Sequence, residues 1–384
     1  MNSGTPLGIG WSQNSIGTNG QRSSSATAYL EPVYNRSNLD VLIQTQVTKL
    51  IPSTSSHGSP SFTAVEMAQS AGSQTYIVNA SKEVVLSAGS IGTPQILMLS
   101  GIGDSNALKS VGVTPIVSLE DVGQNLIDHP LLANQWYVNS TYTFEMVEYN
   151  GTLEEDLLEE WAVDGTGLFV DNGSNQLGWL RLPENASIYR SYSDPSAGPL
   201  SPQIELIFVN GYFSPGTPSP DSGYYMSIST NVVSPSSTGS VTLTSNDPFD
   251  YPNINPNLLG DPFDMAVMVQ ALKDARSFLQ APAWAGYILQ PVVSAFADAT
   301  TDAELEAYAR EYAATVYHPV GTASMEPARG SGGVVTSSLL VKNTSGLRVV
   351  DASVLPYIPS MHPQGVVYAL AERASDLIKA AWGA

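Results

Sequence analysis

Four histidines are the candidates for proton-transfer chemistry, because histidine has an ordinary pKa close to neutral pH. His318 follows a helical apolar pattern, and a helix C-terminus would favour its protonated form and so strengthen it as a general base. His362 lies in the turn of residues 359–365, between a predicted strand and a predicted helix, where α/β sheets bind ligands. His57, in a Ser-, Pro- and Gly-rich loop, and His129, before a proline, are predicted to be structural or surface residues. Residue type alone also leaves a structural role open for His318 and His362.

Other chemistries lack the residues that they need. The chain has no cysteine, which excludes disulfides, thiolate metal sites and a cysteine nucleophile. The G-x-S-x-G elbow of serine hydrolases is absent, and no G-x-G-x-x-G fingerprint follows a predicted strand. The net charge of −20, from 15 basic and 35 acidic residues, would repel nucleic acid and anionic membranes. We therefore expect no nucleic-acid partner, no membrane partner and no metal site.

Strands and helices must position the candidate residues, and the N-terminal third favours an α/β arrangement. Residues 1–28 are polar and rich in Gly, Ser and Asn, which indicates an extended segment. Apolar alternation then predicts three strands, in residues 39–51, 76–78 and 84–86. A helix is predicted over residues 93–99, with Pro94 in its first turn, where a missing N–H does no harm.

The middle of the chain has a different pattern, typical of an antiparallel α+β region. Proline and glycine clusters separate three predicted strands, residues 203–209, 224–233 and 240–243. Two helices are predicted here, over residues 263–279 and 301–316. The second begins with a capping box formed by Thr301 and Glu304, and it would end just before His318.

The last fifty residues return to an α/β pattern. They predict a strand over residues 347–350 and a helix from about residue 366 to residue 382. The helix has a predicted buried stripe of Val367, Leu370, Ala371, Ala374, Leu377, Ile378 and Ala381. The fold class is therefore α/β plus α+β, in which residues 20–130 and 335–384 form one discontinuous domain and residues 131–334 form an inserted antiparallel-sheet domain.

Membrane spans, signal peptides and glycosylation sequons indicate where a protein resides. The uncharged residues 84–103 contain Gly89, Pro94 and Gln95, so a strand, a turn and a short helix fit them better than a membrane span. The polar start at Met1 offers no signal peptide. Seven N-x-[ST] sequons nevertheless favour an extracellular, glycosylated protein in its full-length form: Asn35, Asn79, Asn139, Asn150, Asn172, Asn185 and Asn343.

Several longer motifs resemble those of the glucose-methanol-choline (GMC) oxidoreductases. Residues 88–103, AGSIGTPQILMLSGIG, resemble the second signature of the family, and residues 122–129, VGQNLIDH, resemble the segment after it. Residues 318–325, HPVGTASM, are similar to the motif of the first catalytic histidine, and residues 347–356 to the closing flavin strand. The histidine within residues 360–365, SMHPQG, resembles the aryl-alcohol oxidase branch. The resemblance covers nearly the whole chain from Gly20 onward.

The resemblance implies a role for each matching residue. His318 would be the base that removes the alcohol proton, and His362 would hold the alkoxide, while Tyr317 and Phe213 would line the substrate site as aromatic walls. The cofactor would be FAD, bound in part by Val47, Ser87, Ala88, Gly89, Asp351, Ala352, Gln364, Gly365 and Val366. The discontinuous domain would then be a Rossmann-like FAD-binding domain, and residues 131–334 the substrate-binding domain.

The implied reaction is oxidation of a primary aryl or allylic alcohol to the aldehyde, by hydride transfer to the flavin. Dioxygen, reduced to hydrogen peroxide, or a quinone would accept the electrons, and the enzyme would be a monomer. The missing N-terminal dinucleotide fingerprint makes the FAD-binding domain incomplete. The alternative is therefore a truncated, inactive homologue that does not hold FAD, with a hydrolase or binding protein on a similar scaffold as a third hypothesis.

Overall fold

The computed structural model describes residues 4–54, 59–326 and 332–383. His57 therefore lies outside the described residues. The chain divides into two compact units, each of which is discontinuous in sequence. Unit 1 comprises Met1–Val41, Pro130–Ser236 and Asp261–Val316. Unit 2 comprises Leu42–His129, Ser237–Gly260 and Tyr317–Ala384.

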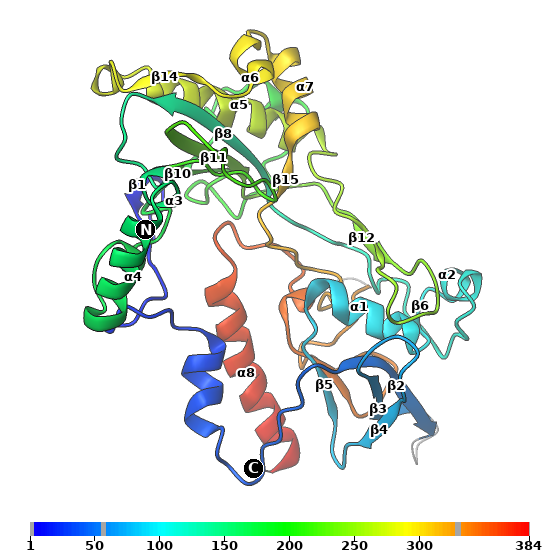
Figure 1. Cartoon of the computed structure of the whole chain (residues 1–384). Coiled ribbons are helices and arrows are strands. Elements are labelled where there is room, and N and C mark those ends of the chain that lie inside the picture. Colours follow the sequence, from blue (N-terminus) through cyan, green and yellow to red (C-terminus); the bar gives the residue numbers. More distant parts are fainter. Residues whose placement is uncertain (1–3, 55–58, 327–331, 384) are drawn as a thin grey trace. The chain divides into compact units, whose positions relative to one another are not determined.

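Unit 1 is built on a seven-stranded sheet whose strand pairs are all antiparallel. The strands follow the order β1-β9-β10-β11-β8-β14, and β15 pairs with β8 (Figure 1). Their bounds are β1 Gly8–Trp11, β8 Pro130–Val138, β9 Gln176–Leu180, β10 Ile204–Val209, β11 Tyr225–Val232, β14 Ile288–Pro291 and β15 Ala314–Thr315. The predicted antiparallel region is thus confirmed, and two of its predicted strands correspond to β10 and β11.

Helices cover one face of this sheet. The longest helix of unit 1, α5 (Pro262–Leu279), packs on β10 and β11 (Figure 1). It starts where Asp261 caps the Phe263 N–H and Pro262 occupies the first turn. The other helices of the unit are α3 (Glu145–Glu148), α4 (Gly151–Asp164), α6 (Ser294–Asp298) and α7 (Asp302–Tyr312). Short η helices lie at Ala26–Leu30, Glu31–Val33, Leu168–Val170, Ser187–Arg190 and Pro282–Trp284.

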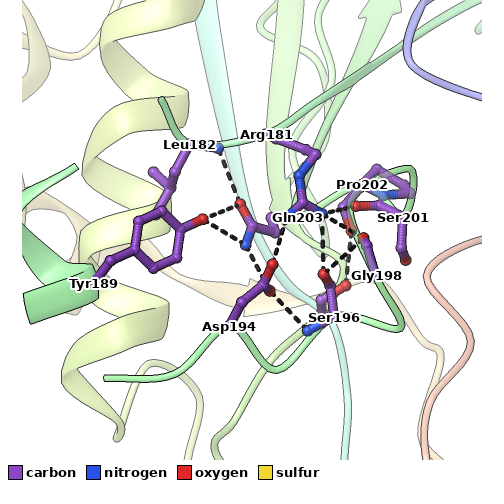
Figure 2. A network of polar contacts seen from close by, with 10 residues as sticks. Arg181, Leu182, Tyr189, Asp194, Ser196, Gly198, Ser201, Pro202 and Gln203 are labelled. Carbon is purple, nitrogen blue, oxygen red and sulfur yellow. Dashed lines mark hydrogen bonds and ion pairs between the residues drawn. The ribbon is translucent and has the colours of Figure 1, made fainter. Parts of the chain in front are cut away.

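A polar network ties the loop after β9 to the start of β10. Figure 2 shows Arg181, which pairs with Asp194 and donates to the carbonyls of Gly198 and Ser201. The buried Gln203 donates to Asp194 over 2.8 Å and accepts from the Leu182 N–H. Burial alone would raise the pKa of Asp194, but these hydrogen bonds, together with those from Ser196, lower it. The network therefore fixes the loop through charge-assisted bonds.

Unit 2 joins residues from distant parts of the chain in small sheets. Strand β5 (Val84–Leu86) pairs in parallel with β16 (Leu347–Val349), which confirms the prediction that these two segments share a sheet. The other sheets are β2 (Gln46–Thr54) with β3 (Pro60–Ala68) and β4 (Tyr76–Asn79), β6 (Ile102–Gly103) with β7 (Val117–Ser118), and β12 (Ser240–Thr242) with β13 (Asn253–Asn255). The helices are α1 (Gly89–Leu99), α2 (Ser105–Ser110), η6 (Ala352–Val354) and α8 (Gln364–Trp382).

The core of unit 2 lies around β5 and β16. Leu86, Leu97, Leu347 and Val349 belong to one cluster of buried apolar side chains, to which helix α1 contributes its inner face. Beside this cluster, Arg348 of β16 is paired with Glu83 through two contacts of 3.1 and 3.2 Å. The two side chains are only 2% and 7% exposed, so this is a buried ion pair between β16 and the residue that precedes β5.

Several predicted element bounds are wrong for local reasons. The strand expected over residues 39–51 begins only at Gln46, and Val41 and Ile43 are exposed. Helix α1 begins at Gly89, so Pro94 lies inside it rather than in its first turn. The capping box of α7 is confirmed, but the helix ends at Tyr312 and the chain continues into β15. In α8 only Ala374 of the predicted stripe is fully buried, while Ala371 and Ala381 are exposed.

The unit boundaries also differ from the expected domain ranges. Residues 237–260 belong to unit 2, because β12 bonds to the segment of Gly123 and Leu126. Gly123 has a φ of +80°, and a Cβ built there would lie 2.2 Å from the Val241 carbonyl, so only glycine allows this approach. Residues 317–334 also join unit 2, while residues 20–41 belong to unit 1. Which unit holds the cofactor and which the substrate stays a prediction.

Candidate active site

Three histidines from distant segments of unit 2 form one cluster. The Nδ1 atoms of His129 and His318 lie 3.1 Å apart, at hydrogen-bond distance, and their rings meet edge to face with centroids 5.3 Å apart. The His362 ring also lies beside His318, with a centroid separation of 5.2 Å. The structure therefore brings together the two histidines predicted to be catalytic and adds His129, which was predicted to be structural or on the surface.

Asp128 holds the backbone on both sides of this cluster. Its Oδ1 accepts from the N–H of His129 over 2.8 Å and from the N–H of His318 over 3.0 Å. The two segments are also joined by the bridge between Ile127 and Val320. Asp128 and His129 are both buried, whereas His318 is half-buried and His362 is exposed, so this carboxylate orders the cluster from its buried side.

Tyr317 is the residue that turns the chain into this contact. It adopts a φ of +63°, in the left-handed region that non-glycine residues rarely enter. Such backbone strain persists only where the surroundings hold it, and it is concentrated at functional sites. The Tyr317 side chain itself is 71% exposed in unit 2. Phe213, the other predicted aromatic wall, belongs to unit 1 and is 36% exposed.

The electrostatics of His318 differ from those expected. Burial of the ring, and secondly the neighbouring His362, lower the pKa of His318 from 6.5 to about 4. The predicted helix dipole does not act on it, because α7 ends six positions earlier at Tyr312. His318 is therefore neutral at physiological pH, which leaves it able to accept a proton. Because its Nδ1 faces His129, Nε2 is the nitrogen left for a substrate.

The predicted cofactor residues lie around the N-termini of two helices. Val47 and Ala88 line one cavity of about 340 Å³, together with Gln46, Gly92, Gln95, Ile96, Leu99 and Pro248. Ser87 and Ala88 are exposed just before α1. Gly89 has a φ of +76°, and a Cβ built there would meet no atom within 4 Å, so open space faces this turn. The concave, mostly apolar lining fits a flat aromatic ring system such as that of FAD.

Asp351 has a structural part in this turn. Its Oδ2 accepts from the Gly89 N–H over 3.0 Å and from Thr93 Oγ1 over 2.6 Å, and its Oδ1 accepts from the Ser353 N–H. The carboxylate thus ties the end of β16 to the start of α1. Ala352 follows it in η6 and is half-buried. The Asp351 carboxylate is thus engaged by contacts within unit 2, and a contact of this residue with a cofactor stays a prediction.

Residues Gln364, Gly365 and Val366 form the first turn of α8. Pro363 precedes them without a side-chain cap, so the helix begins with its dipole unmasked by an acceptor side chain. Gln364 and Gly365 are exposed, whereas Val366 packs against the small cluster of Ile127, Val320 and Leu355. The turn that carries His362 is thereby anchored to the segment that carries His129.

Asp128 and His129 are the site residues that sequence reasoning missed. A signal was available, since both close the motif VGQNLIDH of residues 122–129. Their contact with His318 depends on a pairing between segments some 190 positions apart, which local patterns do not encode. Within residues 4–54, 59–326 and 332–383, no group of His, Cys, Asp and Glu side chains could hold a metal ion. In the same ranges, no helix is long and apolar enough to cross a membrane.

Comparison with known proteins agrees with the resemblance drawn from the motifs. Two family models, both described as GMC oxidoreductase, match residues 1–131 and 235–371. The dehydrogenase eriK of Hericium erinaceus is 41% identical over 99% of this chain and 63% of its own length. A pyranose dehydrogenase of Agaricus campestris is 39% identical over 98% of this chain and 62% of its own length. The chain thus spans somewhat less than two thirds of these relatives.

Solved structures extend the comparison to the fold. A formate oxidase of Aspergillus oryzae, in a study of FAD modification, has a TM-score of 0.87 at 28% identity, over 97% of this chain and 66% of that one. A fungal aryl-alcohol oxidase has a TM-score of 0.79 at 27% identity, over 99% of this chain and 68% of that one. These matches confirm the predicted fold class and FAD as the cofactor of the neighbours. The chain that clusters His129, His318 and His362 belongs to the GMC oxidoreductases, a family of FAD-binding flavoproteins.

Proposed function

We propose that this chain carries the substrate-oxidising machinery of an FAD-dependent enzyme that converts an alcohol into a carbonyl compound. The observation that supports this proposal most is the neutral His318 with two neighbouring imidazoles, those of His129 and His362, whose ring centroids lie 5.3 and 5.2 Å away. The adjacent imidazoles of His318 and His362 suit a substrate hydroxyl, since His318 can take the hydroxyl proton while His362 holds the oxygen. When bound, FAD supplies the acceptor for the hydride that leaves the substrate carbon.

His318 acts as the general base in this proposal. Its Nε2 accepts the hydroxyl proton, and its Nδ1 stays hydrogen-bonded to His129. The lowered pKa of His318 keeps the imidazole unprotonated and able to accept a proton. As the proton moves, an alkoxide forms beside the imidazolium of His318. Coulomb attraction between the two charges stabilises the imidazolium, which raises the affinity of His318 for the proton at this step. His362 hydrogen-bonds the same oxygen and shares its charge.

The cofactor site in this proposal joins the two helix N-termini of unit 2. Val47 and Ala88, with Ser87 and Gly89 beside them, would contact the ring systems of FAD through the 340 Å³ cavity. The main chain after Asp351 and the first turn of α8, Ala352 and Gln364 to Val366, would donate N–H groups to its polar atoms.

For the substrate, we propose a primary aryl or allylic alcohol, with dioxygen or a quinone as the electron acceptor. The aromatic side chain of Tyr317, which precedes His318 in unit 2 and is exposed there, supports this class. A sugar hydroxyl is the second candidate, because relatives with 37 to 39% identity over nearly the whole chain are named pyranose dehydrogenases.

Anaerobic flavin reduction tests both the reaction and the substrate class. The 384-residue chain is incubated with FAD, and bound flavin is followed by its absorbance while benzyl alcohol, an allylic alcohol or glucose is added. We expect the flavin absorbance to bleach with an alcohol of one class. In His318→Ala the flavin should still bind, but the alcohol should no longer bleach it. A chain that binds no FAD would support the alternative of an inactive homologue. Bleaching that is unchanged in His318→Ala would refute the assigned base.

We also propose that the full-length protein is an extracellular, glycosylated monomer. Six of the seven sequon asparagines are exposed, namely Asn35, Asn79, Asn139, Asn150, Asn185 and Asn343, and Asn172 is half-buried. A glycan attached to asparagine is bulky and needs an exposed side chain in the folded protein. Endoglycosidase treatment of protein secreted from a eukaryotic host should lower its mass, and light scattering should give the mass of one chain; an unchanged mass would contradict glycosylation.

A further inference from the structure

The turn that carries His362 also carries an exposed methionine. Met361 is 46% exposed, and the ring of the next residue, His362, lies with its centroid 5.2 Å from that of His318. Among the methionines within the described ranges, Met361 is the only one whose side chain is exposed. Methionine is an apolar residue that soluble proteins usually bury, so its exposure beside a proposed catalytic histidine is unusual.

Two prolines hold the backbone of Met361 in this position. Pro359 and Pro363 lie two positions before and after it, and each fixes one backbone angle of the turn. The Met361 N–H donates to the Pro359 carbonyl over 2.7 Å, which closes a tight turn of three residues. Val366, in the first turn of α8, packs against a buried cluster and anchors the segment that follows. The backbone of Met361 is therefore fixed, while its side chain stays open to solvent.

Other methionines of unit 2 provide a comparison. Met98 is 6% exposed and belongs to the buried cluster around β5 and β16. Met67 and Met325 are half-buried, and Met325 packs against the same cluster. Met325 also follows His318 in the motif HPVGTASM, so it shares a short segment of the chain with that histidine. Exposure, rather than nearness to a histidine in the sequence, therefore distinguishes Met361 from Met325.

We propose that Met361 is the preferred site at which hydrogen peroxide oxidises this chain, and that the resulting sulfoxide disturbs the neighbouring His362. The reaction transfers one oxygen atom: the thioether sulfur attacks the peroxide, an S–O bond forms as the O–O bond breaks, and water leaves. The sulfur loses two electrons and the peroxide gains them. The source of peroxide rests on the proposed function, in which dioxygen accepts the electrons of the alcohol. Peroxide from that reaction is released near a substrate held by His318 and His362.

A sulfoxide at Met361 changes the surroundings of His362. It replaces a flexible apolar side chain by a polar, chiral one whose oxygen accepts hydrogen bonds. In the proposed reaction His362 donates to the substrate oxygen, so a new acceptor one position away competes for the same N–H group. Oxidation of Met361 should therefore weaken alcohol oxidation as turnover proceeds. Reduction of the sulfoxide by a methionine sulfoxide reductase should restore the activity.

Peptide mass spectrometry tests the preferred site without any cofactor or substrate. The folded 384-residue chain is treated with dilute hydrogen peroxide. We expect Met361 to oxidise about 10-fold faster than Met325, and Met98 to be the slowest of the three. In the chain unfolded in urea, the three methionines should oxidise at similar rates, because the difference comes from exposure. Equal rates for Met361 and Met325 in the folded chain would overturn the proposal.

Turnover of the FAD-loaded chain with an alcohol and dioxygen tests the effect on His362. Activity should fall as peroxide accumulates, and either catalase or Met361→Leu, which keeps the apolar side chain without its sulfur, should slow this loss several-fold. Met325→Leu is the matched control and should leave the loss unchanged. A chain that oxidises no alcohol would refute the proposed function, while the faster oxidation of Met361 by added peroxide would still support the preferred site. Complete oxidation of Met361 with no loss of activity would overturn its effect on His362.

Discussion

At pH 5.5 the His318 imidazole should still be neutral, although an ordinary histidine would by then be mostly protonated. Its pKa is lowered from 6.5 to about 4, chiefly by burial and secondly by His362. With these values, about 97% of His318 is neutral at pH 5.5, against about 10% for an unperturbed imidazole. The difference corresponds to about 3 kcal/mol between the two protonation states.

Ring-nitrogen NMR of the ¹⁵N-labelled chain between pH 3.5 and 8 measures this directly, with His318→Gln to assign the resonance. The chain unfolded in urea provides the matched reference near 6.5. In His362→Gln the pKa should rise but stay below 6.5, because burial is the larger cause. A His318 that is half protonated at pH 6 or above in the folded chain would refute the electrostatic reasoning.

The same shift links the stability of the fold to pH. The unfolded chain binds a proton at His318 near pH 6.5, whereas the folded chain binds it only near pH 4. The fold is therefore favoured above pH 6.5 and loses stability as pH falls from 6.5 to 4, by at most about 3 kcal/mol before solvent screening. Urea unfolding at pH 7 and pH 5 should show this loss, and it should shrink in His318→Gln.

Three further changes have outcomes that the structure predicts. Glu83→Gln leaves Arg348 buried without its counter-charge and should lower the free energy of unfolding by about 3 kcal/mol in urea titration, whereas Lys49→Ala, at an exposed ion pair, should cost less than about 1 kcal/mol. Asp128→Ala removes the acceptor shared by the backbone N–H groups of two histidines. It should slow anaerobic flavin reduction by about 10- to 100-fold, because the general base loses its geometry. Ala88→Trp should fill the 340 Å³ cavity and raise the Kd for FAD at least about 10-fold in fluorescence titration.

Each of these predictions has a result that contradicts it. Equal effects of the Glu83 and Lys49 substitutions would mean that burial does not strengthen the first ion pair. Normal flavin reduction in Asp128→Ala would mean that the histidines are ordered without it. Unchanged FAD affinity in Ala88→Trp, with the fold intact by circular dichroism, would place the cofactor outside this cavity.

Local signals in the sequence were sufficient for the main elements of both units. The capping box of Thr301 and Glu304 marks the start of α7, because it depends only on residues three positions apart. Strand β5 and strand β16 were recognised from short apolar runs, and their shared sheet followed from the α/β pattern at both ends of the chain. The end of α7 was misjudged, since an apolar pattern that continues past Tyr312 does not show where the chain leaves the helix for the sheet.

The residue types and motifs likewise determined which family the chain belongs to and which two histidines lie together, because such motifs retain residues whose chemistry the site needs. Only the tertiary structure decided that His129 completes the cluster and that Asp128 orders it, since these contacts join segments 189 and 190 positions apart. It also reversed the expected electrostatics of His318. A pKa depends on desolvation and on the charges within a few ångströms, and both are properties of the packed fold rather than of neighbours along the chain.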